Sequence, residues 1–176
     1  MQLLINAKKI GFAFAAAIAL LMVGLVPGTA NAHRGPGETR DAHELVKTLK
    51  KATNHLKKVE DAVAAGYEPV SPCVEVPGVG AMGIHYLNEA FLDPVIDPEH
   101  PEVLVFMPDE KGKSKLVAVE FLVVGHEVAP AIAGIQFEPG PFLGSHALHA
   151  WIYEKNPTGT FADFNPAISC PAGAGS

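Results

Sequence analysis

The spacing of apolar residues changes near Gly66 and divides the chain into a helical part and a strand-rich part. Between Thr39 and Gly66, apolar positions recur every three or four residues, which is the stripe of an amphipathic α-helix. The residues of this stripe are Leu45, Leu49, Ala52, Leu56, Val59 and Val63. Thr39 or Asp41 can cap the start, and Gly66 can end the helix. The sequence therefore predicts one long helix over residues 39–66.

After Gly66 the pattern is typical of short strands separated by turns rich in glycine and proline. The segments expected to form strands are 81–88, 102–107, 115–124 and 146–155. Residues 92–101 contain three X-Pro steps and are expected to form a loop, and residues 125–145 are expected to form a second one. The prediction is an α+β fold in which the long N-terminal amphipathic helix packs on a mostly antiparallel, curved β-sheet.

The first 32 residues have the features of a cleaved secretory signal. Lys8 and Lys9 precede a run of about 16 apolar residues, and the small residues Ala30 and Ala32 then stand where a signal peptidase cuts. The run is shorter than the roughly 20 residues of a membrane-spanning helix, so we expect no stable membrane span after cleavage. The predicted organisation is a signal peptide over residues 1–32, a flexible linker over 33–38 and a single domain over 39–176. The protein is thus expected in the periplasm or outside the cell.

Removing the signal makes the chain more acidic. Lys8 and Lys9 account for two of the 13 basic residues, and the segment contains none of the 19 acidic ones, so the remainder has a formal net charge of −8. Such a chain is poorly suited to bind nucleic acid, and we predict no nucleic-acid partner. The sequence gives no indication of the oligomeric state.

The two cysteines, Cys73 and Cys170, are expected to form a disulfide, because an exported chain meets an oxidising compartment. The bridge would close a loop of about 97 residues, for which loop entropy gives roughly 4 to 5 kcal/mol of stability. Two free thiols that bind a metal are the alternative, which the compartment and the wide spacing disfavour.

Several segments resemble one group of bacterial proteins. They are "GYEPVSPCV", "MGIHYLN", "LVAVEFLV" and "LHAWIYEKNPTGTFADFNPAISC", spread between Gly66 and Cys170. These segments look like an uncharacterised group of small exported bacterial proteins. The resemblance implies export and brings no activity with it.

Glu120 is the most informative single residue. In the strand 115–124 both faces are apolar, so the strand is expected to be buried on both sides. Glu120 shares one face with Leu116, Ala118, Leu122 and Val124. An isolated carboxylate there is very unfavourable and must be paired, hydrogen-bonded, protonated or bound to a cation.

Histidines from two other segments are the candidate partners of Glu120. His85 lies in the strand 81–88, and His146 and His149 lie in the last strand. Alternation places His149 with Trp151 and Tyr153 on one face and His146 with Leu148 on the other, unless a bulge near His146 lets both converge. The predicted metal ligands are therefore His85, Glu120, His146 and His149, for Zn²⁺, Fe²⁺, Mn²⁺ or Cu²⁺.

Other interpretations of this cluster remain open. Glu120 can accept hydrogen bonds from Tyr86, Trp151 or a histidine in a buried polar cluster that stabilises the fold, or it can form an acid–base dyad without metal. The residues Tyr86, His126, Trp151 and Tyr153 are further candidates for the wall of a pocket. The sequence thus predicts an exported protein that binds a transition metal or a small ligand. The alternative is a non-catalytic structural or binding module of the cell envelope, and the sequence does not decide whether the protein is an enzyme.

Overall fold

The computed structural model describes residues 39–172, which begin with the predicted helix. α1 (Arg40–Thr53) starts at the predicted cap, because the Thr39 side chain accepts a hydrogen bond from the Ala42 amide. Leu45 and Leu49 of the apolar stripe are buried. The predicted signal peptide and linker, residues 1–38, lie outside the described residues.

The prediction of one long helix is wrong, since α1 has only 14 residues. A 3₁₀ turn, η1 (Asn54–Leu56), and a short helix, α2 (Val59–Ala64), follow it. At the break, the Thr53 hydroxyl donates to the Leu49 carbonyl, a local bond that bends helices, and Lys58 is extended. The stripe shifts as a result: Ala62 is buried, whereas Val63 is half exposed.

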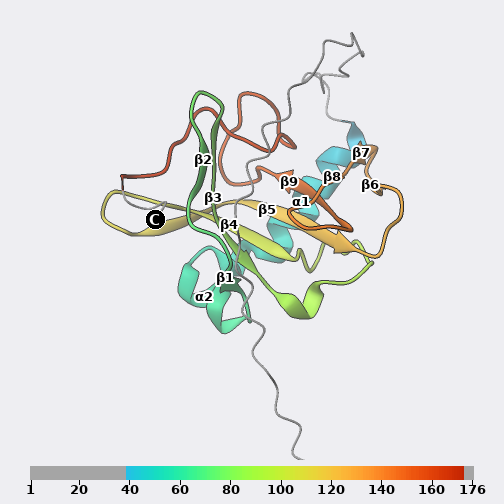
Figure 1. Ribbon diagram of the computed structural model, residues 1–176. Coiled ribbons are helices and arrows are strands. Elements are labelled where there is room, and N and C mark those ends of the chain that lie inside the picture. Colours follow the sequence, from blue (N-terminus) through green and yellow to red (C-terminus); the bar gives the residue numbers. More distant parts are fainter. Residues whose placement is uncertain (1–38, 173–176) are drawn as a thin grey trace, which may run out of the picture. The chain divides into compact units, whose positions relative to one another are not determined.

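The sheet has seven strands, all paired antiparallel, in the order β1-β3-β4-β5-β9-β8, with β2 paired to β3 beside this path (Figure 1). Its members are β1 (Glu68–Pro69), β2 (Val74–Val76), β3 (Gly80–Leu87), β4 (Val103–Pro108), β5 (Ser114–Val124), β8 (Glu138–Pro139) and β9 (Ser145–Ala150). The remaining elements are η2 (Glu89–Phe91) and a separate two-stranded pair of β6 (Ala131–Ile132) and β7 (Ile135–Gln136). The predicted α+β class and antiparallel sheet are confirmed.

The predicted curvature of the sheet is a second correction, because the sheet is not strongly curved. Strands β1, β2 and β8 have only two or three residues each, which is too short to wrap a sheet around a helix. The last strand is also shorter than predicted. It ends at Ala150, and the Trp151 amide donates to the Thr160 carbonyl of the following segment.

The two faces of the sheet carry two separate apolar clusters. Leu45 and Leu49 of α1 pack with Phe121 and Leu148 on one face, and Figure 1 shows α1 in blue behind β5 and β9. The other face packs Val103, Ala118 and Leu122 with Trp151 and the C-terminal segment. We call these the helix face and the C-terminal face.

A bulge in β5 changes which residues share these faces. The β4–β5 register shifts between Val105 and Phe106, so Ala118 pairs with Val105 while Leu116 pairs with Phe106. Leu116 therefore packs on the helix face, not with Glu120 as simple alternation predicts, and Val117 packs on the C-terminal face.

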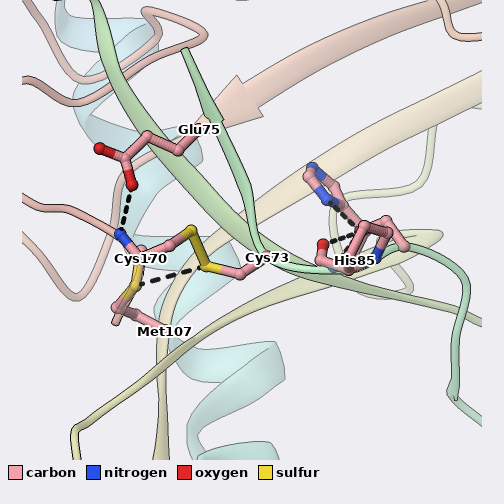
Figure 2. The surroundings of a disulfide bond; sticks show 7 residues. Cys73, Glu75, His85, Met107 and Cys170 are labelled. Carbon is pink, nitrogen blue, oxygen red and sulfur yellow. Dashed lines mark hydrogen bonds between the residues drawn. A yellow bond between two sulfur atoms is a disulfide. The ribbon is translucent and has the colours of Figure 1, made fainter. Parts of the chain in front are cut away.

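The predicted disulfide between Cys73 and Cys170 is confirmed (Figure 2). It ties the segment before β2 to the C-terminal segment, where the Cys170 amide also donates to the Glu75 carboxylate. Such a bond is consistent with an oxidising, exported location. Over residues 39–172, no helix is both long and apolar enough to cross a membrane.

Candidate metal centre

Glu120 lies in the middle of β5, between β4 and β9. It pairs with Val103 on one side and with His149 on the other, and it is only 6 % exposed. The predicted buried carboxylate is therefore present, on the C-terminal face of the sheet.

Three strands bring three possible metal ligands to one point. His149 stands directly opposite Glu120 in the β5–β9 register. His85 comes from β3, where it pairs with Val105 of β4, which in turn pairs with Ala118 of β5. His85 therefore reaches Glu120 diagonally across β4, since Ala118 and Glu120 share a face.

The atoms of this group are close enough to share an ion. The Nε2 atoms of His85 and His149 are 3.3 Å apart, and the Glu120 Oε2 atom lies 3.6 Å from the first and 3.8 Å from the second. The side chains of His85, Glu120 and His149 are 12 %, 7 % and 4 % exposed. His85, Glu120 and His149 form the one cluster of His, Cys, Asp or Glu side chains in residues 39–172 whose ligand atoms are close enough to hold a metal ion.

The other ring nitrogen of each histidine faces a polar side chain. The Nδ1 atom of His85 lies 3.0 Å from the Ser71 hydroxyl, in the segment that leads to β2. The Nδ1 atom of His149 lies 3.8 Å from the Asp163 Oδ1 atom, in the C-terminal segment. Partners of this kind orient the imidazoles that bind metals.

The electrostatics differ between the two histidines. Burial, with a smaller contribution from His149, lowers the pKa of His85 to about 3, so its imidazole is neutral across the physiological range. Burial also lowers the pKa of His149, but the Glu120 and Asp163 carboxylates together outweigh it and raise that pKa overall. Burial raises the pKa of Glu120, which His149 partly offsets. The protons of this group are therefore shared between Glu120 and His149.

His146, the fourth predicted ligand, does not join the group. The β5–β9 register runs without interruption from Val124–Ser145 to Val119–Ala150, so no bulge turns His146 toward Glu120. It lies three residues from His149 and therefore on the opposite face, as simple alternation implies. Its Nδ1 atom is buried without a hydrogen-bond partner in the described part of the chain.

The four residues suggested for a pocket wall are spread over the molecule. Tyr86 and Tyr153 pack in the cluster of the helix face, and Trp151 packs on the C-terminal face, where its indole donates to the Ala162 carbonyl. His126 lines a surface hollow of about 650 Å³ together with His146. Tyr86 and Trp151 therefore do not supply the hydrogen bond to Glu120 that the interpretation as a buried polar cluster proposed. The side chains close to the Glu120 carboxylate are those of His85 and His149.

Sequence reasoning missed one buried acid, Glu102, which is 1 % exposed. Its Oε2 atom accepts a hydrogen bond from the Leu122 amide of β5 at 3.0 Å. Because β4 begins only at Val103, the carboxyl takes the place of a backbone carbonyl of a neighbouring strand. Burial is the main reason that its pKa rises to about 7, with Asp93 and Glu120 adding to the rise against two backbone hydrogen bonds. The sequence contained one indication of this buried acid, since Glu102 is the first residue of the predicted strand 102–107 and all the others are apolar.

Ser71 and Asp163 were also missed, because they lie in irregular segments where no periodicity shows which way a side chain points. Two imidazole nitrogens and a carboxylate oxygen, converging in a water-poor interior, can bind a proton or a divalent metal ion.

Comparison with known proteins adds no assignment: no protein-family model, curated protein or solved structure matches the chain. The resemblance to small exported bacterial proteins therefore stays a prediction.

Proposed function

We propose that this protein is exported and binds one divalent transition-metal ion through His85, Glu120 and His149, with Zn²⁺ as the best fit. The observation that carries the proposal is the triangle formed by the two Nε2 atoms and the Glu120 Oε2 atom.

The size of this triangle suits a metal ion. With sides of 3.3, 3.6 and 3.8 Å, its equidistant point lies about 2.1 Å from each atom, which is the usual length of Zn–N and Zn–O bonds. Two ligand atoms that each lie 2.1 Å from an ion are about 3.4 Å apart in a tetrahedron and about 3.0 Å apart in an octahedron. The observed separations lie closer to the tetrahedral value than to the octahedral one, which favours Zn²⁺ over the octahedral facial arrangement of Fe²⁺.

The ligand types support the same choice. Two imidazoles and one carboxylate are a known ligand set for zinc, whereas Cu²⁺ prefers square-planar or tetragonal coordination and Mn²⁺ prefers oxygen ligands. Three protein ligands leave one coordination position for water or a small ligand, as in catalytic zinc sites. Because the three side chains are at most 12 % exposed, that position is open only to small molecules.

The buried charges support a cation as well. A carboxylate in an apolar layer is costly unless a positive charge compensates it. The lowered pKa of His85 leaves that histidine neutral, so the compensating charge is either a proton on His149, whose pKa Glu120 and Asp163 raise, or a metal ion in its place. The disulfide supports export, because it needs an oxidising compartment.

Elemental analysis tests the proposal. The chain is exported from its host without a histidine tag, purified, and assayed for metal; it is then stripped with a chelator and titrated with Zn²⁺ against a chromogenic competitor. We expect one ion per chain in the wild type and none retained by His149→Ala. The matched control is His146→Ala, which removes a histidine from the same strand on the opposite face and should leave binding unchanged.

Two results would contradict the proposal. One is a folded wild type that neither carries metal nor binds Zn²⁺ after stripping, which would favour the alternative of a buried cluster that only stabilises the fold. The other is equal loss of metal in both histidine variants, which would place the ion elsewhere.

A further inference from the structure

We propose that Ser71 and Asp163 are positioning residues, each of which accepts the Nδ1 proton of one histidine and so turns the Nε2 atom of that ring toward the metal position. The consequence for metal affinity rests on the proposed function, whereas the positions of the ring protons can be measured in the metal-free protein.

The hydrogen bonds of Ser71 determine the proton position on His85. The Ser71 hydroxyl lies 2.8 Å from the Pro72 carbonyl, which can only accept, and 3.0 Å from the His85 amide, which can only donate. Its single proton is therefore used on Pro72. Toward the His85 Nδ1 atom, 3.0 Å away, the hydroxyl must then accept. All three contacts are hydrogen bonds only if Nδ1 carries the proton and Nε2 carries the lone pair.

Asp163 acts in the same way on His149. Its carboxylate can only accept, so a contact with Nδ1 favours the proton on that nitrogen. The separation of 3.8 Å is longer than a hydrogen bond, so the proposal requires the half-exposed Asp163 side chain to move closer to Nδ1. The segment that carries it is held in place, since the Trp151 indole donates to the Ala162 carbonyl and the fully buried Asn165 pairs with Ala81.

The two contacts prepare the site for a cation. With both Nδ1 atoms protonated, the proton of the 3.3 Å hydrogen bond between the two Nε2 atoms belongs to His149, and a metal ion that displaces it meets two Nε2 lone pairs and the Glu120 carboxylate within 4 Å of one another. If either histidine lost its Nδ1 partner, the proton could move to Nε2 and occupy the metal position. Loss of such outer partners typically weakens metal binding 10- to 100-fold.

Three variants test the effect on affinity. Ser71→Ala and Asp163→Asn should each weaken Zn²⁺ binding about 10- to 100-fold in the competition assay. Ser71→Thr, which keeps a hydroxyl, should restore binding. The matched control is Asp97→Asn, because Asp97 contacts the Nδ1 atom of the surface residue His100 at 2.8 Å and lies outside the site; it should bind as the wild type does.

Nitrogen NMR of the histidine rings gives a readout that a merely structural role would not change. In metal-free wild type we expect the neutral ring of His85 to carry its proton on Nδ1, and the ring of His149 to carry a proton on Nδ1 with or without a second one on Nε2. Each variant should shift its own histidine toward a form protonated on Nε2 alone. A neutral His85 protonated on Nε2, or a His149 ring without a proton on Nδ1, in the metal-free wild type would overturn the inference, whether or not zinc binds. Variants that bind zinc like the wild type would overturn it while leaving the proposed function standing.

Discussion

Replacing Glu102 with glutamine should remove a large part of the pH dependence of stability. In the folded protein the pKa of Glu102 is about 7, mainly because the carboxyl is buried, against about 4.5 for an unperturbed glutamate. The folded state therefore binds the proton more tightly than the unfolded state does. The stabilisation that Glu102 gains from this difference in proton affinity is fully present below about pH 4.5 and is lost as the pH rises to about 7.

The size of the effect follows from the two pKa values. Each unit of difference corresponds to about 1.4 kcal/mol, so ionising Glu102 should cost the folded state about 3 kcal/mol by pH 8. Glutamine keeps an oxygen that can accept from the Leu122 amide and carries no charge. The stability of Glu102→Gln relative to wild type should thus increase by about 3 kcal/mol between pH 4.5 and pH 8.

Urea unfolding of the metal-stripped proteins at several pH values measures this difference directly. Titrating groups that do not interact with Glu102 contribute equally to both proteins and cancel, whereas the coupling of Glu102 to Asp93 and Glu120 is part of the measured difference. A difference between the two proteins that stays constant from pH 4.5 to 8, or that runs in the opposite direction, would refute the assignment of a raised pKa to this buried acid.

Three further predictions follow from the structure. Reducing the disulfide should lower the free energy of unfolding by roughly 4 to 5 kcal/mol, because the loop spans 97 residues; an unchanged urea midpoint would contradict this. Gly80→Ala should be strongly destabilising in urea unfolding, since the added Cβ would lie 2.5 Å from the Asn165 carbonyl oxygen. The control Gly134→Ala is also at positive φ but has open space around it, so it should lower the free energy of unfolding by only about 1 to 2 kcal/mol. Zinc binding should release more protons as the pH falls, because the raised pKa of His149 favours the protonated ring, whose Nε2 proton the ion must displace. Calorimetry at several pH values in buffers of different ionisation enthalpy measures this, and a heat independent of the buffer at every pH would contradict it.

The sequence predicted the parts of the fold that depend on local periodicity. The strand 115–124 is apolar on both faces, and it is indeed buried, with Glu120 inside it. The helical stripe continued through the residues after Thr53, yet α1 ends there. Periodicity reports which side chains share a face, and it does not report a local hydrogen bond such as that of the Thr53 hydroxyl.

The candidate site was predicted in part for a similar reason. Alternation separated His146 from His149 but could not choose between them, because the choice depends on the register that places His149 opposite Glu120. His85 reaches the site across β4, a relation between strands far apart in the sequence. Ser71 and Asp163 were beyond reach, since their positions depend on loops anchored by tertiary contacts.

The most direct test of metal binding is to locate the ion. Crystals of the zinc-loaded protein should give an anomalous difference peak at the zinc absorption edge about 2.1 Å from His85 Nε2, His149 Nε2 and Glu120 Oε2. A zinc peak elsewhere, for example at His126 or His146, or no peak between these three side chains at full zinc loading, would contradict the account.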